Sequence, residues 1–173
     1  MTIKNNWNDT NSLPKYLIIA KELAYDCCHF EITLPQPESE SADYDAYTFH
    51  LNGKQICYRT AKITPTKTGQ FVTLWKRNKN GTIEPFDFSD SIDFVIISVR
   101  KNDLFGQFIF PKSILLEKGI FSTNRKDGKR AIRVYPPWDK TTSKQAQKTQ
   151  QWQLEHFYKI TPDLDYNKFK ALF

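Results

Sequence analysis

AYTFHLNGKQICYRTAK, residues 46–62, contains two runs of alternating apolar and polar residues joined by Asn52-Gly53. This dipeptide favours a two-residue type I′ turn, because both turn positions need a positive φ. A loop of this length fixes the register of a hairpin. The register predicts that Phe49 faces Ile56 on an apolar side. The polar side then carries Thr48, His50, Cys57 and Arg59.

The segments around this hairpin predict helices and further strands. Residues 70–77 and 104–110 have strand patterns, and the continuous apolar run 92–99 predicts a central strand covered on both faces. Helical patterns span 12–28, 111–119 and 141–160. We therefore expect one α/β (α+β) domain over residues 12–173, with a mixed β-sheet flanked by helices, after a flexible lead at residues 1–11.

The composition favours an anionic partner. The chain has 173 residues and a net charge of +6, which is high enough to attract polyanions. Its three cysteines are odd in number, and the sequence shows neither a secretion signal nor an apolar run of membrane-spanning length. We expect a cytoplasmic protein without a membrane partner.

The segment 54–79 has no carboxylate, although carboxylates flank it at Asp45 and Glu84. Its cations are interleaved with Tyr58, Phe71 and Trp75. Cations beside flat rings suit a phosphate backbone with stackable bases, whereas a solvated basic surface is the alternative. Two further basic runs, at 125–133 and 140–148, lie near Trp138 and Trp152.

We expect the three basic runs to converge on a groove that binds nucleic acid, either DNA or RNA. No motif for reading base sequence is present. The residues predicted to bind are Arg59, Lys62, Lys67, Trp75, Lys76, Arg77, Lys112, Arg133, Lys144 and Lys148.

Patterns typical of catalysis are weak. His50 and Cys57 lie diagonally on one side of the predicted hairpin, but no acid nearby in the sequence would orient the histidine. Residues 27–29, Cys-Cys-His, have no partner pair at metal-ligand spacing. The acidic cluster at 87–93 is typical of a turn with capping side chains. The sequence therefore predicts no catalytic residue, metal ligand or cofactor.

Several segments resemble the MepB protein family, a set of small bacterial proteins, one of which is encoded beside a multidrug efflux pump and its repressor. The resemblance covers roughly residues 44–160, and its motifs are AYTFHLNGKQICYRTAKITPTKTGQFVTLWKR, DFVIISV, GQFIFPKSILLEKGI, GKRAIRVYPPWD and SKQAQKTQQWQ. It implies a fold similar to that of PD-(D/E)XK nucleases, with a nucleic-acid surface and a link to a drug-response operon.

Such nucleases need an acid on one core strand and an acid-X-Lys triplet on the next. If residues 70–77 are the second strand, Lys76 matches the lysine, but Leu74 stands in place of the acid. If residues 104–110 are the second strand, Asp93 offers the first acid, but Gln107-Phe108-Ile109 supplies neither acid nor lysine. The resemblance therefore implies an inactive relative. The alternatives are a metal-dependent nuclease with rearranged ligands and a module that docks an acidic protein regulator.

Overall fold

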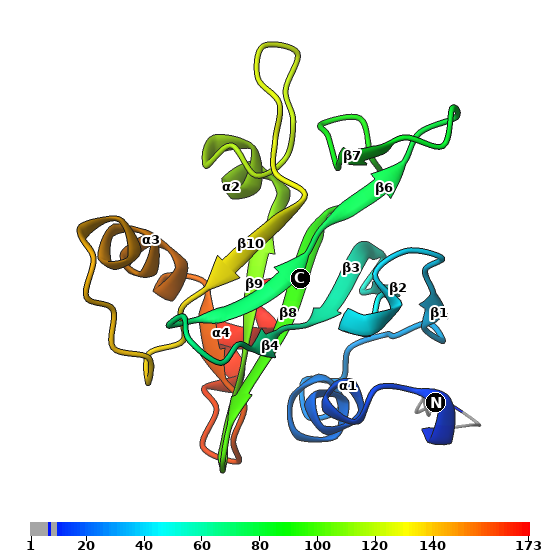
Figure 1. Ribbon diagram of the computed structural model, residues 1–173. Helices are drawn as coiled ribbons and strands as arrows, with labels where there is room; N and C mark the ends of the chain where they lie inside the picture. The colour runs from blue at the N-terminus through cyan, green and yellow to red at the C-terminus, as the bar shows by residue number, and fades with distance from the viewer. Residues whose placement is uncertain (1–6, 8–9) are drawn as a thin grey trace.

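A mixed six-stranded sheet lies at the centre of the molecule in the computed structural model, which describes Trp7 and residues 10–173 (Figure 1). The strands β3 and β8 run parallel, and the other neighbours run antiparallel. In spatial order the strands are β1 (Gln36–Pro37), β2 (Tyr47–Leu51), β3 (Lys54–Thr60), β8 (Phe94–Lys101), β9 (Leu104–Pro111) and β11 (Phe157–Lys159). With helices on both faces, this sheet confirms the predicted α+β fold.

The hairpin of β2 and β3 has the predicted register. Phe49 pairs with Ile56, and the turn residues Asn52 and Gly53 have φ values of 50° and 76°. The positive φ at both positions is what a type I′ turn requires. The side predicted to be polar is only partly open to solvent, however, because His50 is exposed but Cys57 is fully buried beneath a second layer.

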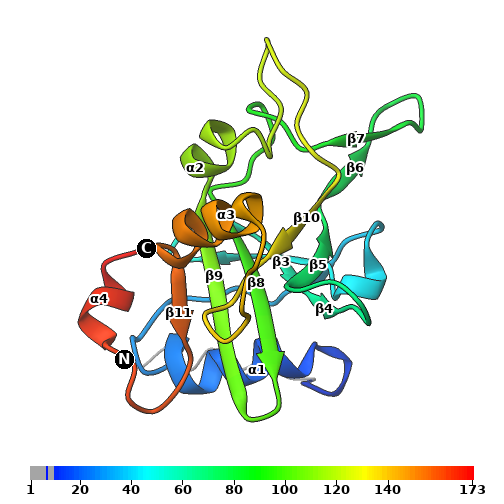
Figure 2. The ribbon, with the colours of Figure 1, turned by 60° about the vertical axis from the view of Figure 1, so that its left-hand side comes forward.

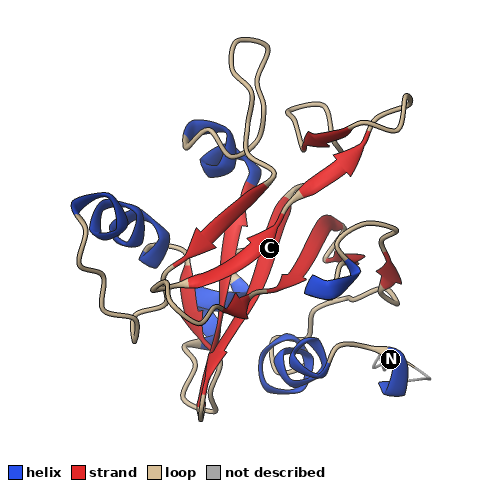
Figure 3. Ribbon diagram, viewed as in Figure 1, coloured by secondary structure: helices blue, strands red, loops and turns tan. Residues whose placement is uncertain are grey.

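The second layer is a three-stranded sheet that packs on the central one. Its order is β10 (Ala131–Val134), β5 (Gln70–Thr73) and β4 (Lys62–Ile63). The predicted single strand over 70–77 is wrong, because it is divided at Leu74 into β5 and β6 (Trp75–Arg77). The N–H of the buried Leu74 donates to Arg130 O at 2.8 Å, and β6 then pairs with β7 (Ile83–Pro85) in a separate ribbon (Figure 3).

Two apolar clusters fill the faces of the central sheet. On one face, Ile56 and Ile96 pack with the first helix and with Phe169 near the C-terminus. On the other face, Val95 and Phe110 pack under the three-stranded sheet. Burial on both sides explains why the central strand reads as a continuous apolar run.

The helices cover these two faces (Figure 2). The predicted helix over 12–28 forms as α1 (Lys15–Ala20) continued by the π-helical turn η2 (Lys21–Tyr25). The predicted helix over 141–160 ends early, because residues 157–159 extend the sheet as β11. The remaining helices are η1 (Thr10–Ser12), η3 (Ala42–Tyr44), α2 (Lys112–Glu117), α3 (Lys144–Leu154) and α4 (Tyr166–Lys170).

Most of the predicted flexible lead, residues 1–6 and 8–9, lies outside the described residues. Trp7 is buried and packs in the first apolar cluster, with the Lys21 ammonium 5.2 Å from the ring centre. Among the described residues, no helix is both long and apolar enough to cross a membrane.

Candidate functional site

Two cations and two aromatic rings form a row on the solvent-facing side of the three-stranded sheet. The strand register places Lys62 and Arg133 on either side of Phe71. The Arg133 guanidinium lies 5.8 Å from the centre of the Phe71 ring, and Lys62 Nζ lies 4.8 Å from that of Tyr44. The two rings meet edge to face at 6.0 Å. We call these four residues the cation–aromatic row.

A cationic groove begins beside this row, between β10 and α3. It consists of two adjoining hollows of about 350 and 230 Å³, which share Arg133, Tyr135, Ser143 and Ala146. No residue that lines either hollow carries a carboxylate. The cations of the groove come from separate segments of the chain and are Lys67, Lys118, Lys129 and Arg133.

The orientation of Arg133 is fixed by neighbouring oxygen atoms. Its guanidinium donates to Thr64 Oγ1 at 2.9 Å and to the carbonyls of Thr68 and Gly69 at 3.3 and 3.4 Å. These acceptors are neutral, so the positive charge of Arg133 remains uncompensated at the wall of the groove. An uncompensated, positioned guanidinium suits a phosphate ligand.

The opposite wall is held in place by uncharged glutamines of α3. Gln153 accepts from Tyr135 N at 2.8 Å and donates to Arg133 O at 2.9 Å, which satisfies the free edge of β10. Gln150 donates to the carbonyls of Pro136 and Asp139, both at 2.9 Å. These bonds fix α3 against the segment after β10, and we call them the glutamine clamp.

Only one of the three tryptophans predicted near the basic runs lines the groove. The Trp152 ring borders it, with Lys118 Nζ 5.6 Å from the ring centre. Trp138 instead packs edge to face on Phe157 in the core. Trp75 lies on the β6–β7 ribbon, outside the groove, and stacks on Arg77 at 5.4 Å.

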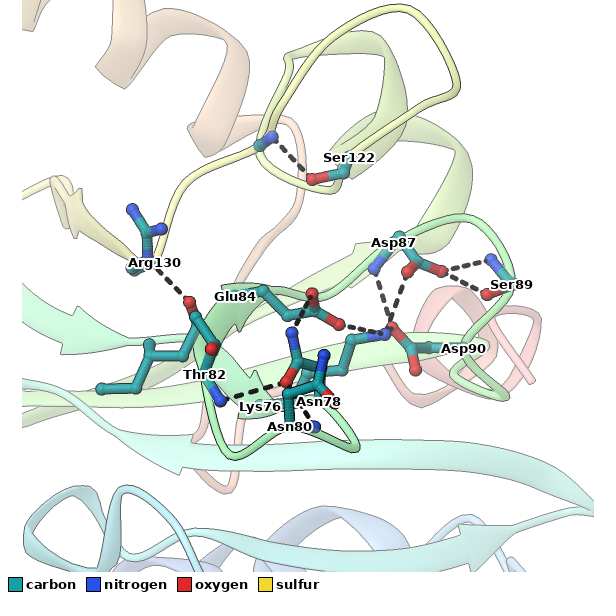
Figure 4. Close-up of polar contacts among 12 residues, drawn as sticks. Lys76, Asn78, Asn80, Thr82, Glu84, Asp87, Ser89, Asp90, Ser122 and Arg130 are labelled. Atoms are coloured by element: carbon teal, nitrogen blue, oxygen red, sulfur yellow. Dashed lines mark hydrogen bonds and ion pairs between the residues drawn. The ribbon is translucent and has the colours of Figure 1, made fainter.

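Lys76 is neutralised by acids (Figure 4). Its Nζ lies 2.7 Å from Asp90 Oδ2, 2.9 Å from Asp87 Oδ2 and 3.6 Å from Glu84 Oε1. Although burial opposes the ionisation of Asp87, hydrogen bonds from Ser89 and Lys76 lower its pKa to about 2. Lys76 therefore stabilises the β6–β7 ribbon and does not offer a free charge to a ligand.

Arg59 does not belong to an accessible surface. Its side chain is fully buried and forms an ion pair with Glu38, at 2.8 Å between Nη2 and Oε2. Its remaining donors bond to the carbonyls of Thr73 and Tyr58. The prediction placed Arg59 on a polar face of the hairpin, and the second layer covers the part of that face that carries Arg59 and Cys57.

Arg77 and Lys112 are also partnered within the molecule. Arg77 Nε donates to Glu40 at 2.7 Å, and Lys112 Nζ donates to the carbonyl of Asp90. Lys144 and Lys148 lie exposed on α3, one turn apart, but do not line the groove. Of the predicted binding residues, the groove and the cation–aromatic row bring together Lys62, Lys67 and Arg133.

Two groove cations, Lys118 and Lys129, were missing from the predicted binding set. Lys129 belongs to the second basic run, at 125–133, so the charge pattern of the sequence could have identified it. Lys118 follows α2 beside the turn at Gly119, and nothing in the local sequence relates it to β10 or α3.

The positions that the nuclease resemblance singles out have structural roles. Leu74 is buried, and the buried amide of Gln107 bonds to Tyr25 and Ser98. Asp93 Oδ2 accepts the N–H of Gln55 at 2.8 Å. Within the described part of the chain, no group of three or more His, Cys, Asp or Glu side chains is placed to hold a metal ion.

The pair of His50 and Cys57 does not form a nucleophile and its base. Burial raises the pKa of the Cys57 thiol to about 12, despite the nearby Arg59 cation. The thiol contacts Glu38 at 3.7 Å, whereas His50 is exposed and pairs across the hairpin with Gln55. A buried thiol with a raised pKa is inert.

Comparison with known proteins gives a family match. The MepB-like family model matches residues 38–159. A crystal structure of MepB is 36% identical in sequence, with a TM-score of 0.74 over 85% of this chain and 97% of that chain. A bacterial homing endonuclease, I-Ssp6803I, aligns at 13% identity and a TM-score of 0.43, over 90% of this chain and 89% of that one. Among curated proteins, no significant match was found. This chain belongs to the MepB-like family.

Proposed function

We propose that this protein binds nucleic acid through the cationic groove and the adjacent cation–aromatic row, without catalysing a reaction on it. The observation that carries the proposal is that four cations line one groove whose lining contains no carboxylate. Lys118 Nζ lies 3.7 Å from the exposed Glu117 carboxylate, a surface pair that water and salt screen, so the groove keeps an excess of positive charge. Such a groove attracts phosphates, and each neutralised phosphate releases condensed counterions.

Aromatic rings support the same ligand. Tyr135 and Trp152 line the groove, and Phe71 and Tyr44 lie in the row beside it. Bases stack on such rings irrespective of sequence. The groove therefore suits binding that depends on phosphates and stacking, with no preference for a particular base sequence.

The test is a fluorescence-anisotropy titration of nuclease-treated protein with labelled single-stranded RNA, single-stranded DNA and duplex DNA at several salt concentrations. The K118Q/K129Q double variant should lower the slope of log affinity against log salt by about 1.5 units, because it removes two groove cations. The matched control is K54Q/K159Q, which removes two exposed lysines that lie outside the groove and should leave the slope unchanged.

An affinity that does not depend on salt, or an equal loss in both double variants, would overturn the proposal. A protein partner that survives nuclease treatment in a pull-down would favour the alternative of an acidic regulator. Cleavage of plasmid or RNA in Mg²⁺ or Mn²⁺, abolished by EDTA, would favour a nuclease.

Two further parts of the proposal rest on other grounds. We also propose a link to drug efflux, which only membership of the MepB-like family supports, and a cytoplasmic location, which the three free cysteines support. Deleting the gene and measuring efflux-pump transcripts, with fractionation of the cells, tests both.

A further inference from the structure

A second cavity, of about 360 Å³, lies at the carboxyl ends of the parallel strands β3 and β8. Its volume falls within the range of small-molecule pockets. The segments that line it are the start of α1, the η3 turn, the β3–β4 connection, the first residue of β5 and the end of β8. None of its lining residues belongs to the cationic groove.

Charges of both signs face this cavity without neutralising one another. Asp43 and Asp45 supply carboxylates, and Lys62 and Arg100 supply cations. In the described part of the chain, none of these four side chains forms an ion pair within 4.0 Å. Opposite charges in one small cavity would normally pair, so their separation leaves both signs available to a ligand.

Aromatic rings hold the two cations. Arg100 lies 5.1 Å from the centre of the Tyr16 ring, which also lines the cavity, and Lys62 lies 4.8 Å from that of Tyr44. A cation over a ring face is stabilised without losing its net charge. Arg100 and Lys62 can therefore still attract an anionic group.

A buried acceptor without a partner adds a third observation. Gln70 lines the cavity with only 1% of its surface exposed, and its Nε2 donates to Arg100 O at 2.9 Å. Its Oε1 has no hydrogen-bond partner among the described residues. An unpaired buried oxygen is unfavourable, and a donor in the cavity would satisfy it after a small movement of the Gln70 side chain.

We propose that this cavity binds a small zwitterion with a primary ammonium and a carboxylate, that is, a free α-amino acid. An ammonium has three N–H donors and one positive charge, which match the carboxylates of Asp43 and Asp45 and the Gln70 oxygen. The carboxylate of the ligand then meets Arg100, whose guanidinium is suited to it, and Lys62. This site is separate from the cationic groove, although it shares Lys62 with the cation–aromatic row.

The test is isothermal titration calorimetry of the full chain with a panel of L-α-amino acids. At least one should bind, and its N-acetyl derivative, which lacks the ammonium, and its methyl ester, which lacks the carboxylate, should each bind at least about tenfold more weakly. D45N and R100Q should weaken binding similarly. D103N, in the exposed β8–β9 turn, is the control and should bind like the wild type.

If a variant does not fold, NMR of the wild-type protein decides, because the side-chain amide of Gln70 and the Nε–H of Arg100 must shift when the amino acid is added. The proposal is overturned if no amino acid binds at millimolar concentration, or if those signals do not move. If the methyl ester binds as tightly as the amino acid, the site recognises only the ammonium, and the assigned ligand is wrong. Tighter binding of a polyamine or a mononucleotide would also overturn the assigned ligand.

Discussion

Glu38 and Arg59 form a two-point ion pair, with 3.0 Å between Oε1 and Nη1 and 2.8 Å between Oε2 and Nη2. The Arg59 side chain is fully buried, and that of Glu38 is 17% exposed. Arg59 also donates to Thr73 O at 3.1 Å. The pair therefore joins β3 of the central sheet to the segment after β1 and to β5 in the second layer.

Glu38→Gln should lower the free energy of unfolding by about 3 kcal/mol, because it leaves the buried Arg59 charge uncompensated. The double variant E38Q/R59M should recover part of this loss, since no unpaired buried charge remains. Urea denaturation monitored by circular dichroism measures both. A change of less than about 0.5 kcal/mol in E38Q, as at an ordinary surface position, would contradict this role.

The contact of Lys76 with Asp87 predicts a pH-dependent stability. The folded pKa of Asp87, about 2, lies below its ordinary value, so its contribution is present above about pH 4 and is lost as the pH falls towards 2. Wild-type protein should therefore be more stable than D87N at pH 7, and the difference should shrink between pH 4 and pH 2. Thermal denaturation of both proteins across this range checks the prediction, which a constant difference would refute.

Salt titrations should separate Lys76 from Lys129. Lys76→Gln should leave the salt slope of nucleic-acid binding unchanged, because three acids already surround its ammonium. Lys129→Gln should lower the slope by about 0.7 to 0.9 units, the contribution of one phosphate contact. Anisotropy at several salt concentrations measures both slopes. The opposite ranking would place the interface on the β6–β7 ribbon.

Gly69→Ala should destabilise the protein and disturb the groove. Gly69 has a φ of 84°, and a Cβ there would lie 2.7 Å from the ring of Tyr135. Gly81→Ala is the matched control, because Gly81 has a φ of 78° and nothing within 4 Å of the added carbon. Both variants should lose about 1 kcal/mol from the left-handed backbone, and only G69A should lose more and bind nucleic acid less well. Equal losses on urea denaturation would show that Tyr135 moves aside freely.

Local patterns were sufficient to predict the framework of the fold. The Asn52-Gly53 turn determined the register of β2 and β3, because it depends only on adjacent backbone conformations. The continuous apolar run at 92–99 predicted a central strand, because only a strand buried on both faces needs apolar residues at successive positions. Val95, Ile96 and Ile97 are all fully buried. The division of residues 70–77 at Leu74 could not be predicted in this way, because it reflects a change of pairing partner, from the distant strand β10 to β7.

The candidate site was harder to predict, because charge in a sequence does not show which charges are paired. Arg59, Lys67 and Lys76 lie in one carboxylate-free segment, and Arg133 lies in a second basic run. Nothing in the sequence distinguished the cations that are paired from those that are free. The partners of the paired cations, Glu38 and the acids at 84–90, lie outside that segment and come close only in the folded chain. Lys118 joins the groove for the same reason, through tertiary packing.

The glutamine clamp has a consequence for solution behaviour. Gln150 and Gln153 fix α3 through hydrogen bonds between neutral groups, which ions in solution screen little, whereas the groove they support is lined with cations. The shape of the groove should therefore stay constant over the range of ionic strength in which its attraction for polyanions fades. Raising the ionic strength would then release a bound nucleic acid reversibly, while α3 stays in place against β10.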